Sequence, residues 1–291
     1  MKISHLVLTV LLSAAVAFSV VKVAAPTTTS AAKETAFERV MRTGVLRCGY
    51  YVFSPVTIRD PNTNVLSGFS VDMMERIAQR AGLKLEWSEE VTFANWIPAL
   101  QSKRFDVVCT PMWPEITMAK AVVFTDPMFY ASLSPLVRAS DTRFKDDLSR
   151  LNQPDVTFLT QDGNTTDLLA RETFPKAKFY TVSNMMSGGE FYQSILANKA
   201  DVVLTDSNAL AQFKKMNGKT LRLMDTDHPV KLQSFTLVVE RNEMLLKDFL
   251  DQAIREMNNS GEIDRLLRKW EAEPGRTFLR VAQPFAKPTE K

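Results

Sequence analysis

The chain has 291 residues, of which 45% are hydrophobic and 24% charged, and its formal net charge is +3. This composition is that of a folded protein of about two domains, and it excludes disordered and collagen-like chains. The charge is too small and too evenly spread to favour a nucleic-acid-binding protein. Two cysteines and two histidines are too few for a thiolate-rich or histidine-rich metal site, so we predict no metal and no other cofactor.

Residues 1–32 differ in composition from the rest of the chain. Lys2 precedes an uncharged apolar run over 6–21, which is followed by small and polar residues as far as Ala32. This order is typical of a secretory signal peptide that is cleaved after Ala32. The alternative is an uncleaved N-terminal anchor, although the run is shorter than the roughly 20 residues that a membrane span needs. Both interpretations predict that the remaining chain is exported.

The first part of the exported chain alternates strand-like and helix-like segments. Buried strands are predicted over 45–49, 83–87 and 105–110, and helices over 70–81 and 93–103. Ser70 is the candidate N-cap of the first of these helices, and Gly82 follows its last turn. Strands and helices that alternate at this spacing require parallel pairing and right-handed crossovers.

A second unit of the same kind begins near residue 155. Its predicted strands cover 156–160, 178–182, 200–205 and 221–224, and its helices cover 166–173, 189–198 and 207–216. Two further β-like segments, 130–139 and 233–240, lie before and after this unit. Two helices, 243–259 and 262–271, come last before the C-terminal tail.

This order of segments predicts an α/β protein of two lobes with a cleft between them. If the last two helices pack on the first unit, the chain crosses between the lobes twice, and the two β-like segments form a double-crossover hinge. Lobe 1 then covers 40–135 and 236–272, lobe 2 covers 140–228, and 273–291 is a flexible tail. The cleft lies at the carboxyl ends of parallel strands, where α/β sheets bind ligands. Hinged closure on a small molecule is the expected function, and a rigid two-lobe enzyme is the alternative.

Seven segments, in order, carry a resemblance to a known family. They are GVLRCGYY, LSGFSVDMMERIAQRAG, ANWIPALQSKRFDVV, KAVVFTDPMFY, QDGNTT, KADVVLTD and NNSGEIDRLLRKW. With them the chain resembles the family 3 extracellular solute-binding proteins of bacterial ABC transporters, of the amino-acid-binding type, over nearly all of 40–272. The resemblance implies a monomeric periplasmic protein of the type II two-lobe fold. It also implies that the solute is delivered to a membrane permease.

The resemblance also assigns ligand-binding positions. Family members hold the ammonium group of an amino acid with an aspartate that matches Asp206 here, although an acid at a helix N-terminus is also favoured by the helix dipole. The arginine that holds the carboxylate falls on Met118, and the threonine three residues before it falls on Glu115. In lobe 2, Asn164 and Thr165 keep hydrogen-bonding groups at a ligand-binding turn. The cation-binding half of the site is therefore predicted to be present, and the carboxylate-binding half absent.

Aromatic residues are predicted to replace the missing half. The resemblance places Phe93 where family members have an aromatic that sandwiches the ligand side chain, and Tyr51 and Phe53 are predicted to lie on a loop that faces the cleft. Stacking and cation–π contacts of about 0.5–2 kcal/mol each favour a flat or cationic solute. The alternative is that Phe53 and Trp113 belong to the core of lobe 1. The complete predicted site consists of Tyr51, Phe53, Phe93, Thr110, Trp113, Asn164, Thr165 and Asp206.

Three functions compete on this fold. The preferred one is solute binding without catalysis, for the import of a small amine-bearing or aromatic, amino-acid-like solute. The second is a periplasmic enzyme that resembles cyclohexadienyl dehydratases; it needs an acid or base and anchors for a dicarboxylate. The lost arginine argues against such a substrate, and Glu115, the one candidate general acid, is more simply a solvated rim charge. The third function is a ligand-sensing domain that acts through a partner.

Cys48 and Cys109 fall near the carboxyl ends of strands that are predicted to be neighbours. The spacing of adjacent strands, about 4.8 Å, lies inside the Cα separation range of disulfides. An exported protein also folds in an oxidising compartment. A bridge across adjacent parallel strands is strained, however, so two buried thiols are the simpler expectation, and a disulfide is the alternative.

Overall fold

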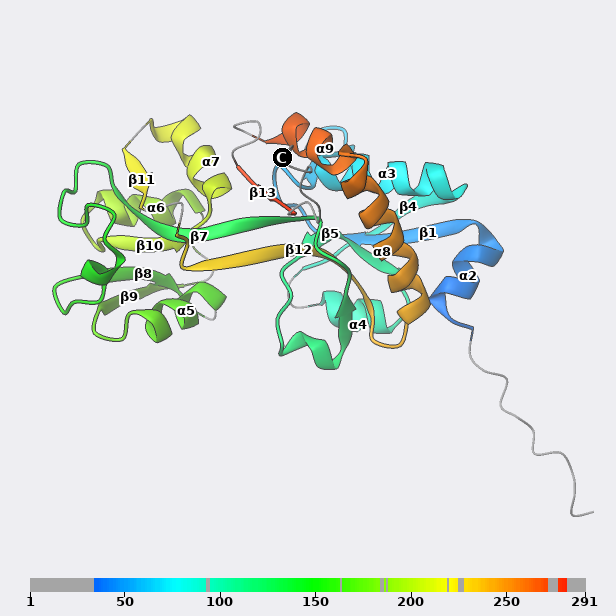
Figure 1. Ribbon diagram of the computed structural model, residues 1–291, viewed down its shortest axis with the longest axis horizontal. Coiled ribbons are helices and arrows are strands. Elements are labelled where there is room, and N and C mark those ends of the chain that lie inside the picture. Colours follow the sequence, from blue (N-terminus) through cyan, green and yellow to red (C-terminus); the bar gives the residue numbers. More distant parts are fainter. Residues whose placement is uncertain are drawn as a thin grey trace, which may run out of the picture.

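Two α/β lobes, joined by two long strands, make up the protein (Figure 1). The structure is a computed structural model that describes residues 34–92, 95–162, 164–183, 186, 188–218, 220–224, 228–271 and 277–281. The predicted signal peptide or anchor lies outside the described residues. Within them, no helix combines the length and apolar character needed to cross a membrane.

Lobe 1 is built on three parallel strands in the order β4-β1-β5. The strands are β1 (Val45–Tyr50), β4 (Lys84–Glu90) and β5 (Val107–Met112), with the short β2 (Ile58–Arg59), β3 (Leu66–Ser67) and β6 (Val122–Phe124). The helices are α2 (Ala36–Thr43), α3 (Phe69–Ala81) and α4 (Trp96–Gln101), with the single turn η1 (Met118–Lys120). The predicted strand–helix alternation and parallel pairing are confirmed.

Lobe 2 repeats this arrangement with a second parallel core, in which β8 pairs with β9 and with β10. Its strands are β8 (Thr157–Gln161), β9 (Lys178–Val182), β10 (Val202–Thr205) and β11 (Leu221–Leu223). Its helices are α5 (Thr165–Thr173), α6 (Gly188–Leu196) and α7 (Ser207–Asn217), with the short turn η2 (Leu148–Leu151). The carboxyl ends of β8 and β10 lie on the side of lobe 2 that faces lobe 1. The chain continues from these ends into α5 and α7.

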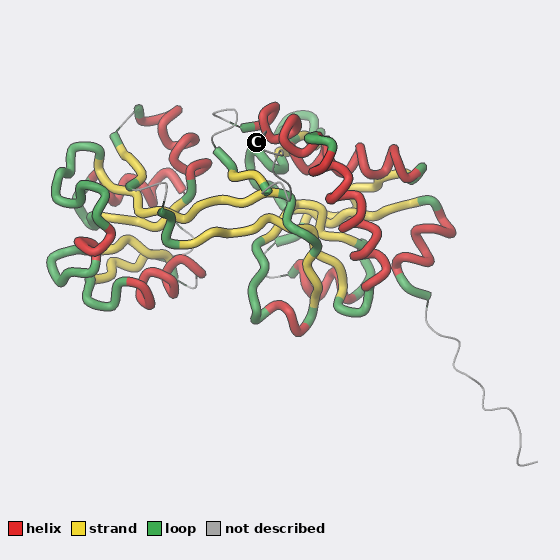
Figure 2. Tube along the Cα trace, in the orientation of Figure 1, coloured by secondary structure: helices red, strands yellow, loops and turns green. Residues whose placement is uncertain are grey.

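The two crossover strands are β7 (Phe129–Arg138) and β12 (Lys231–Glu240), and they are shared by both lobes. They pair antiparallel with each other from Lys231 opposite Leu133 to Phe235 opposite Phe129. Beyond that stretch β7 pairs with β10 in lobe 2, and β12 pairs with β5 in lobe 1. Figure 2 shows both strands running without interruption from one lobe to the other. A two-strand connection of this kind is the predicted double-crossover hinge.

The last two helices lie against lobe 1. α8 (Met244–Asn259) contacts α2, β6 and β12, and α9 (Glu262–Trp270) contacts α3 (Figure 1). Phe37 and Phe249 meet with ring centroids 6.3 Å apart, and the Trp270 indole donates to Asp72 across 2.6 Å. The chain therefore returns from lobe 2 to close the lobe in which it began.

A C-terminal segment departs from the expected flexible tail over 273–291. β13 (Leu279–Arg280) pairs antiparallel with β7, and Phe278 is buried with its ring 4.8 Å from that of Phe129. Arg280 forms an ion pair with Glu271 at 2.6 Å. The tail prediction is wrong for 277–281, because burial of the Phe278 ring holds this segment at the base of the hinge.

α3 begins at a backbone contact rather than at a side-chain cap. Its N-cap is Gly68, not the predicted Ser70, which is buried in the first turn. Gly68 has φ = +121°, and a Cβ at this position would lie 2.5 Å from the carbonyl oxygen of Val56. Only glycine permits this approach, so the loop before α3 decides where the helix starts.

Cys48 of β1 and Cys109 of β5 form a disulfide, with Cα atoms 5.4 Å apart. Both side chains are fully buried in the main core of lobe 1. The expectation of two free thiols is therefore wrong, because the pairing of β1 with β5 brings the two sulfur atoms within bonding distance.

We expect replacement of Thr35 by alanine to destabilise the protein by about 1 kcal/mol, because Thr35 and Glu38 form a reciprocal capping box at the start of α2. For a protein of this size that loss lowers the melting temperature by roughly 2–4 °C. The control is Thr117→Ala, since Thr117 precedes η1 without a side-chain cap bond. Equal melting temperatures of the two variants would contradict this assignment.

Candidate functional site

A cavity of about 250 Å³ lies where lobe 2 meets the hinge and the first loop after β5. Lobe 2 supplies most of its wall, from the carboxyl ends of β8 and β10 and from α5, α6 and α7. The lining residues are Trp113, Leu133, Gln161, Asn164, Thr166, Met186, Phe191, Tyr192, Leu204, Thr205, Asp206 and Ala209. The cavity occupies the place that parallel sheets offer to ligands, at the carboxyl ends of their strands.

Asp206 supplies a carboxylate to this cavity. It directly follows β10 and caps α7, where its Oδ1 accepts a hydrogen bond from the Ala209 N–H at 2.9 Å. The side chain is only 9% exposed, and this burial raises its pKa above the ordinary value of an aspartate. Backbone N–H groups of Ala209 and Asn208 oppose that rise without cancelling it. The carboxylate is thus held by dipoles and capable of pairing with a cation.

The absence of a counter-charge distinguishes Asp206 from the other buried acids of the described chain. Six others form an ion pair with arginine or lysine: Asp106, Asp167, Glu243, Asp251, Glu262 and Glu271. For Asp206 the described residues include no such partner. A buried charge costs free energy unless it is paired, so Asp206 at the cavity wall is a candidate binding group.

Aromatic side chains form the rest of the wall near Asp206. Trp113 enters from lobe 1, and its indole packs edge-on against Phe235 with ring centroids 6.0 Å apart. Tyr192 enters from α6, and its hydroxyl shares a hydrogen bond with Thr205 at 2.7 Å. Burial raises the pKa of Tyr192 to about 12, so the phenol stays neutral at physiological pH. The cavity therefore combines one acid with neutral aromatic faces, which attract cations.

Four of the predicted site residues do not line this cavity: Tyr51, Phe53, Thr110 and Thr165. Thr110 is fully buried, and its hydroxyl is bonded to Thr57 and to the Tyr51 carbonyl oxygen. The Tyr51 hydroxyl donates to the Pro111 carbonyl oxygen at 2.6 Å, and the Phe53 ring stacks on Phe235. These contacts join the loop after β1 to strand β5 and to the core of lobe 1, so the polar groups have their hydrogen-bond partners inside that lobe. Trp113, Asn164 and Asp206 do line the cavity, and Phe93 lies outside the described residues.

Two hydrogen bonds connect the lobes beside the cavity. Thr165, the first residue of α5, donates from its hydroxyl to Glu115 Oε1 at 2.6 Å. Asn208 of α7 donates to the Ser54 carbonyl oxygen at 3.2 Å. Glu115 is thus half-buried and bonded across the lobes, not the solvated rim charge that was the simpler expectation.

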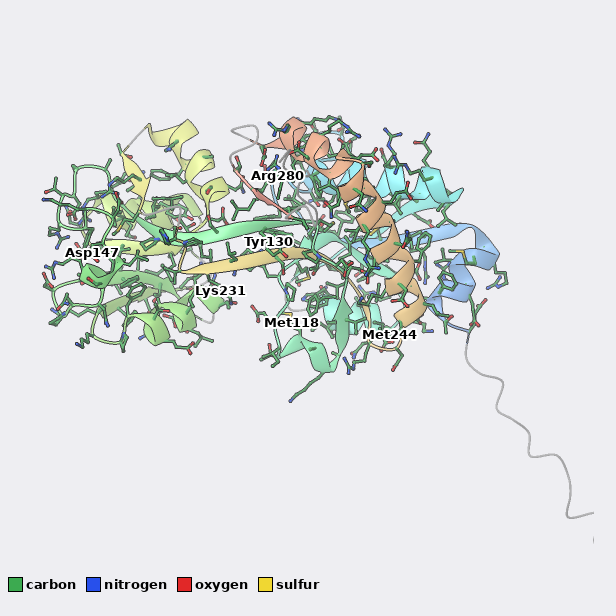
Figure 3. The ribbon with its side chains drawn as sticks, viewed as in Figure 1. Met118, Tyr130, Asp147, Lys231, Met244 and Arg280 are labelled. Carbon is green, nitrogen blue, oxygen red and sulfur yellow. A yellow bond between two sulfur atoms is a disulfide. The ribbon has the colours of Figure 1, made fainter. Side chains whose placement is uncertain are left out.

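Met118 stands on the lobe 1 side of the gap between the lobes (Figure 3). Its side chain packs at the margin of the apolar cluster that contains Trp96 and Leu100. It brings no charge to the site, and the described lining of the cavity contains no lysine or arginine. No group of three or more metal-ligating side chains occurs within the described ranges.

Several lining residues were not predicted from the sequence, above all Tyr192, Thr205 and Leu133. Thr205 directly precedes Asp206, so its position at the end of a strand was an available signal. No signal in the sequence indicates Tyr192, because the face of α6 that contacts the cavity depends on how the helix packs.

Comparison with known proteins identifies the family of the chain. Residues 46–273 match the bacterial extracellular solute-binding proteins, family 3. The chain belongs to this family. Its members are exported, and the relatives of this solute-binding protein include amino-acid-binding proteins of ABC transporters.

Three similar proteins illustrate the range of the relatives. The cyclohexadienyl dehydratase of Pseudomonas aeruginosa is 23% identical over 240 residues, which cover 82% of this chain and 87% of the relative. The arginine-binding extracellular protein ArtP of Bacillus subtilis is 25% identical over 204 residues, covering 70% and 77%. The crystal structure of an ancestral amino acid-binding protein, AncCDT-1, a precursor of cyclohexadienyl dehydratase, has a TM-score of 0.65 and 27% identity. It covers 82% of this chain and 100% of its own.

Proposed function

We propose that the protein is the solute-binding component of an ABC importer and that its solute carries an amine or another cationic group. The observation that carries the proposal is Asp206, a buried carboxylate at the cavity wall without a cationic partner in the described chain. An ammonium group bound there would give the carboxylate the counter-charge that the other buried acids already have. The permease that receives the solute is the partner that the family implies.

The lining of the cavity also supports selection against ordinary amino acids. By the resemblance, the arginine that binds the ligand carboxylate in family members falls on Met118, and the described lining contains no lysine or arginine. Hydrogen bonds to charged groups contribute roughly 1.5–3 kcal/mol each. Their loss should weaken binding of a simple amino acid by at least tenfold to hundredfold. Aromatic faces of Trp113 and Tyr192 favour a flat or cationic solute instead.

A dehydratase is the second candidate function, because one relative carries that activity. Glu115 is the candidate general acid, and its carboxylate already accepts a hydrogen bond from Thr165. The described cavity lining lacks a basic anchor for a dicarboxylate, so binding without catalysis is the better supported function. Mass spectrometry after incubation with a cyclohexadienyl acid distinguishes the two, since loss of water from the added acid would establish the enzyme.

We expect a thermal-shift panel at millimolar concentration to separate amines from amino acids. A ligand at 100 times its Kd stabilises the folded state by about 2.7 kcal/mol, or roughly 5–10 °C here. Amine or aromatic cationic solutes should produce such a shift, and the twenty free amino acids should produce little. Mass spectrometry of the solute that copurifies with the protein identifies the natural ligand. A large shift with glutamate, aspartate or an aliphatic amino acid would overturn the proposal.

A further inference from the structure

Glu115 places a second carboxylate next to the residues that line the same cavity. It lies in the loop between β5 and η1, two residues after Trp113, which lines the cavity. Its Oε1 accepts the hydrogen bond from Thr165, and the residues on either side of that threonine, Asn164 and Thr166, also line the cavity. The carboxylate therefore belongs to lobe 1 and stands against the lobe 2 wall of the site.

The charge of Glu115 is uncompensated by any cation in the described residues. Its contact there is the Thr165 hydroxyl, a neutral donor in the first turn of α5. This neutral hydroxyl holds the carboxylate in place without supplying a counter-charge. Asp206, which lines the cavity from lobe 2, also has no cationic partner in the described chain. Two acidic side chains, one on each lobe, thus lie at the cavity wall or beside it.

We propose that Glu115 is a specificity-determining residue and that the solute carries two cationic groups, one paired with Asp206 and the other with Glu115. The inference rests on the proposed function, because it assumes that Asp206 binds the first cation. A solute of this class is a linear diamine or an amino-guanidine whose apolar linker packs on Trp113 and Leu133. The negative charge of Glu115 also repels a ligand carboxylate.

The test is calorimetric titration of the purified protein with two matched series of ligands. One series is 1,4-diaminobutane, 1,5-diaminopentane and 1,6-diaminohexane, and the other is the monoamines of the same carbon number. In the native protein at least one diamine should bind about tenfold or more tightly than its monoamine, since a second charged contact has that effect. In Glu115→Gln, which keeps the size and the acceptor for Thr165, this advantage should fall to about twofold or less.

A second variant separates the effect of the Glu115 charge from the effect of its hydrogen bond to Thr165 between the lobes. Thr165→Val breaks the hydrogen bond and leaves the Glu115 charge in place, so the diamine advantage should persist. If monoamines and diamines bind equally in the native protein, Glu115 is an interlobe contact only and the inference is overturned. Equal weakening of both series in both variants leads to the same conclusion. In either case, if Asp206→Asn loses the binding of monoamines, the proposed function is still supported. If neither series binds, the inference fails, and the thermal-shift panel decides the proposed function separately.

Discussion

Replacement of Asp206 by asparagine should weaken binding of a cationic solute by roughly tenfold to hundredfold and should stabilise the ligand-free protein at neutral pH. The affinity falls because a charge-assisted hydrogen bond of about 1.5–3 kcal/mol becomes a neutral one. The stability rises because the variant no longer buries a carboxylate without a cation. Asparagine is as good an N-cap as aspartate, so α7 keeps the bond to the Ala209 N–H.

The sign of the pH dependence follows from the raised pKa of Asp206. Below the pKa of an aspartate in the unfolded chain, about 3.9, Asp206 is protonated in both the folded and the unfolded state, so it does not lower the stability. As the pH rises from this value to the raised pKa of Asp206 in the folded protein, the unfolded chain releases this proton first. The free energy of unfolding therefore falls over this pH range. Asp206→Asn should therefore gain stability over the native protein as the pH rises from 4 to 7.5. The affinity of the native protein for a cation should weaken as the pH falls through the same raised pKa.

Melting temperatures of the ligand-free proteins at pH 4 and pH 7.5, with titrations of one amine at both values, check this prediction. Asp206→Ala is the matched control, since it removes the charge and also the cap of α7, which costs about 1 kcal/mol. Asp206→Ala should bind the amine as weakly as Asp206→Asn does. It should melt at a lower temperature than Asp206→Asn, because it lacks the cap of α7. An asparagine variant that binds an amine as tightly as the native protein would contradict the role given to Asp206.

The arrangement of strands and helices was predictable because local signals agree with the tertiary structure. Short apolar runs mark β1, β5 and β10, and Gly82 ends α3 as expected. The start of α3 was not predictable, because the carbonyl of Val56 and the positive φ of Gly68 decide it. The burial of Phe278 was not predictable either, since the space that this ring fills is made by β7 and β12.

The site was predictable in part, for a related reason. Asp206 directly follows β10 and Asn164 comes three residues after β8, and parallel strands place such residues at one edge of the sheet. The hydroxyls of Tyr51 and Thr110 were misplaced, because the partners that turn them inward come from a different loop and strand. Tyr192 depends on the packing of α6, and a one-residue rotation of that helix would place another side chain in the wall.

Loss of the Cys48–Cys109 disulfide should destabilise the protein by about 2–4 kcal/mol. The two cysteines are 61 residues apart, so the bridge restricts a long loop of the unfolded chain, which by loop-closure entropy contributes about 4 kcal/mol at most. The bridge also joins β1 and β5, the strands that lead into the loops of Tyr51 and Trp113.

The double variant Cys48→Ala/Cys109→Ala should melt roughly 5–15 °C below the oxidised protein. Alanine is the appropriate replacement, since both positions are fully buried and a serine hydroxyl would lack a partner among the apolar neighbours of this core. Reductant should lower the melting temperature of the native protein and leave that of the double variant unchanged. Thiol titration in denaturant without reductant is the decisive measurement, because two free thiols per chain would mean that the stability of lobe 1 comes from its packed core alone.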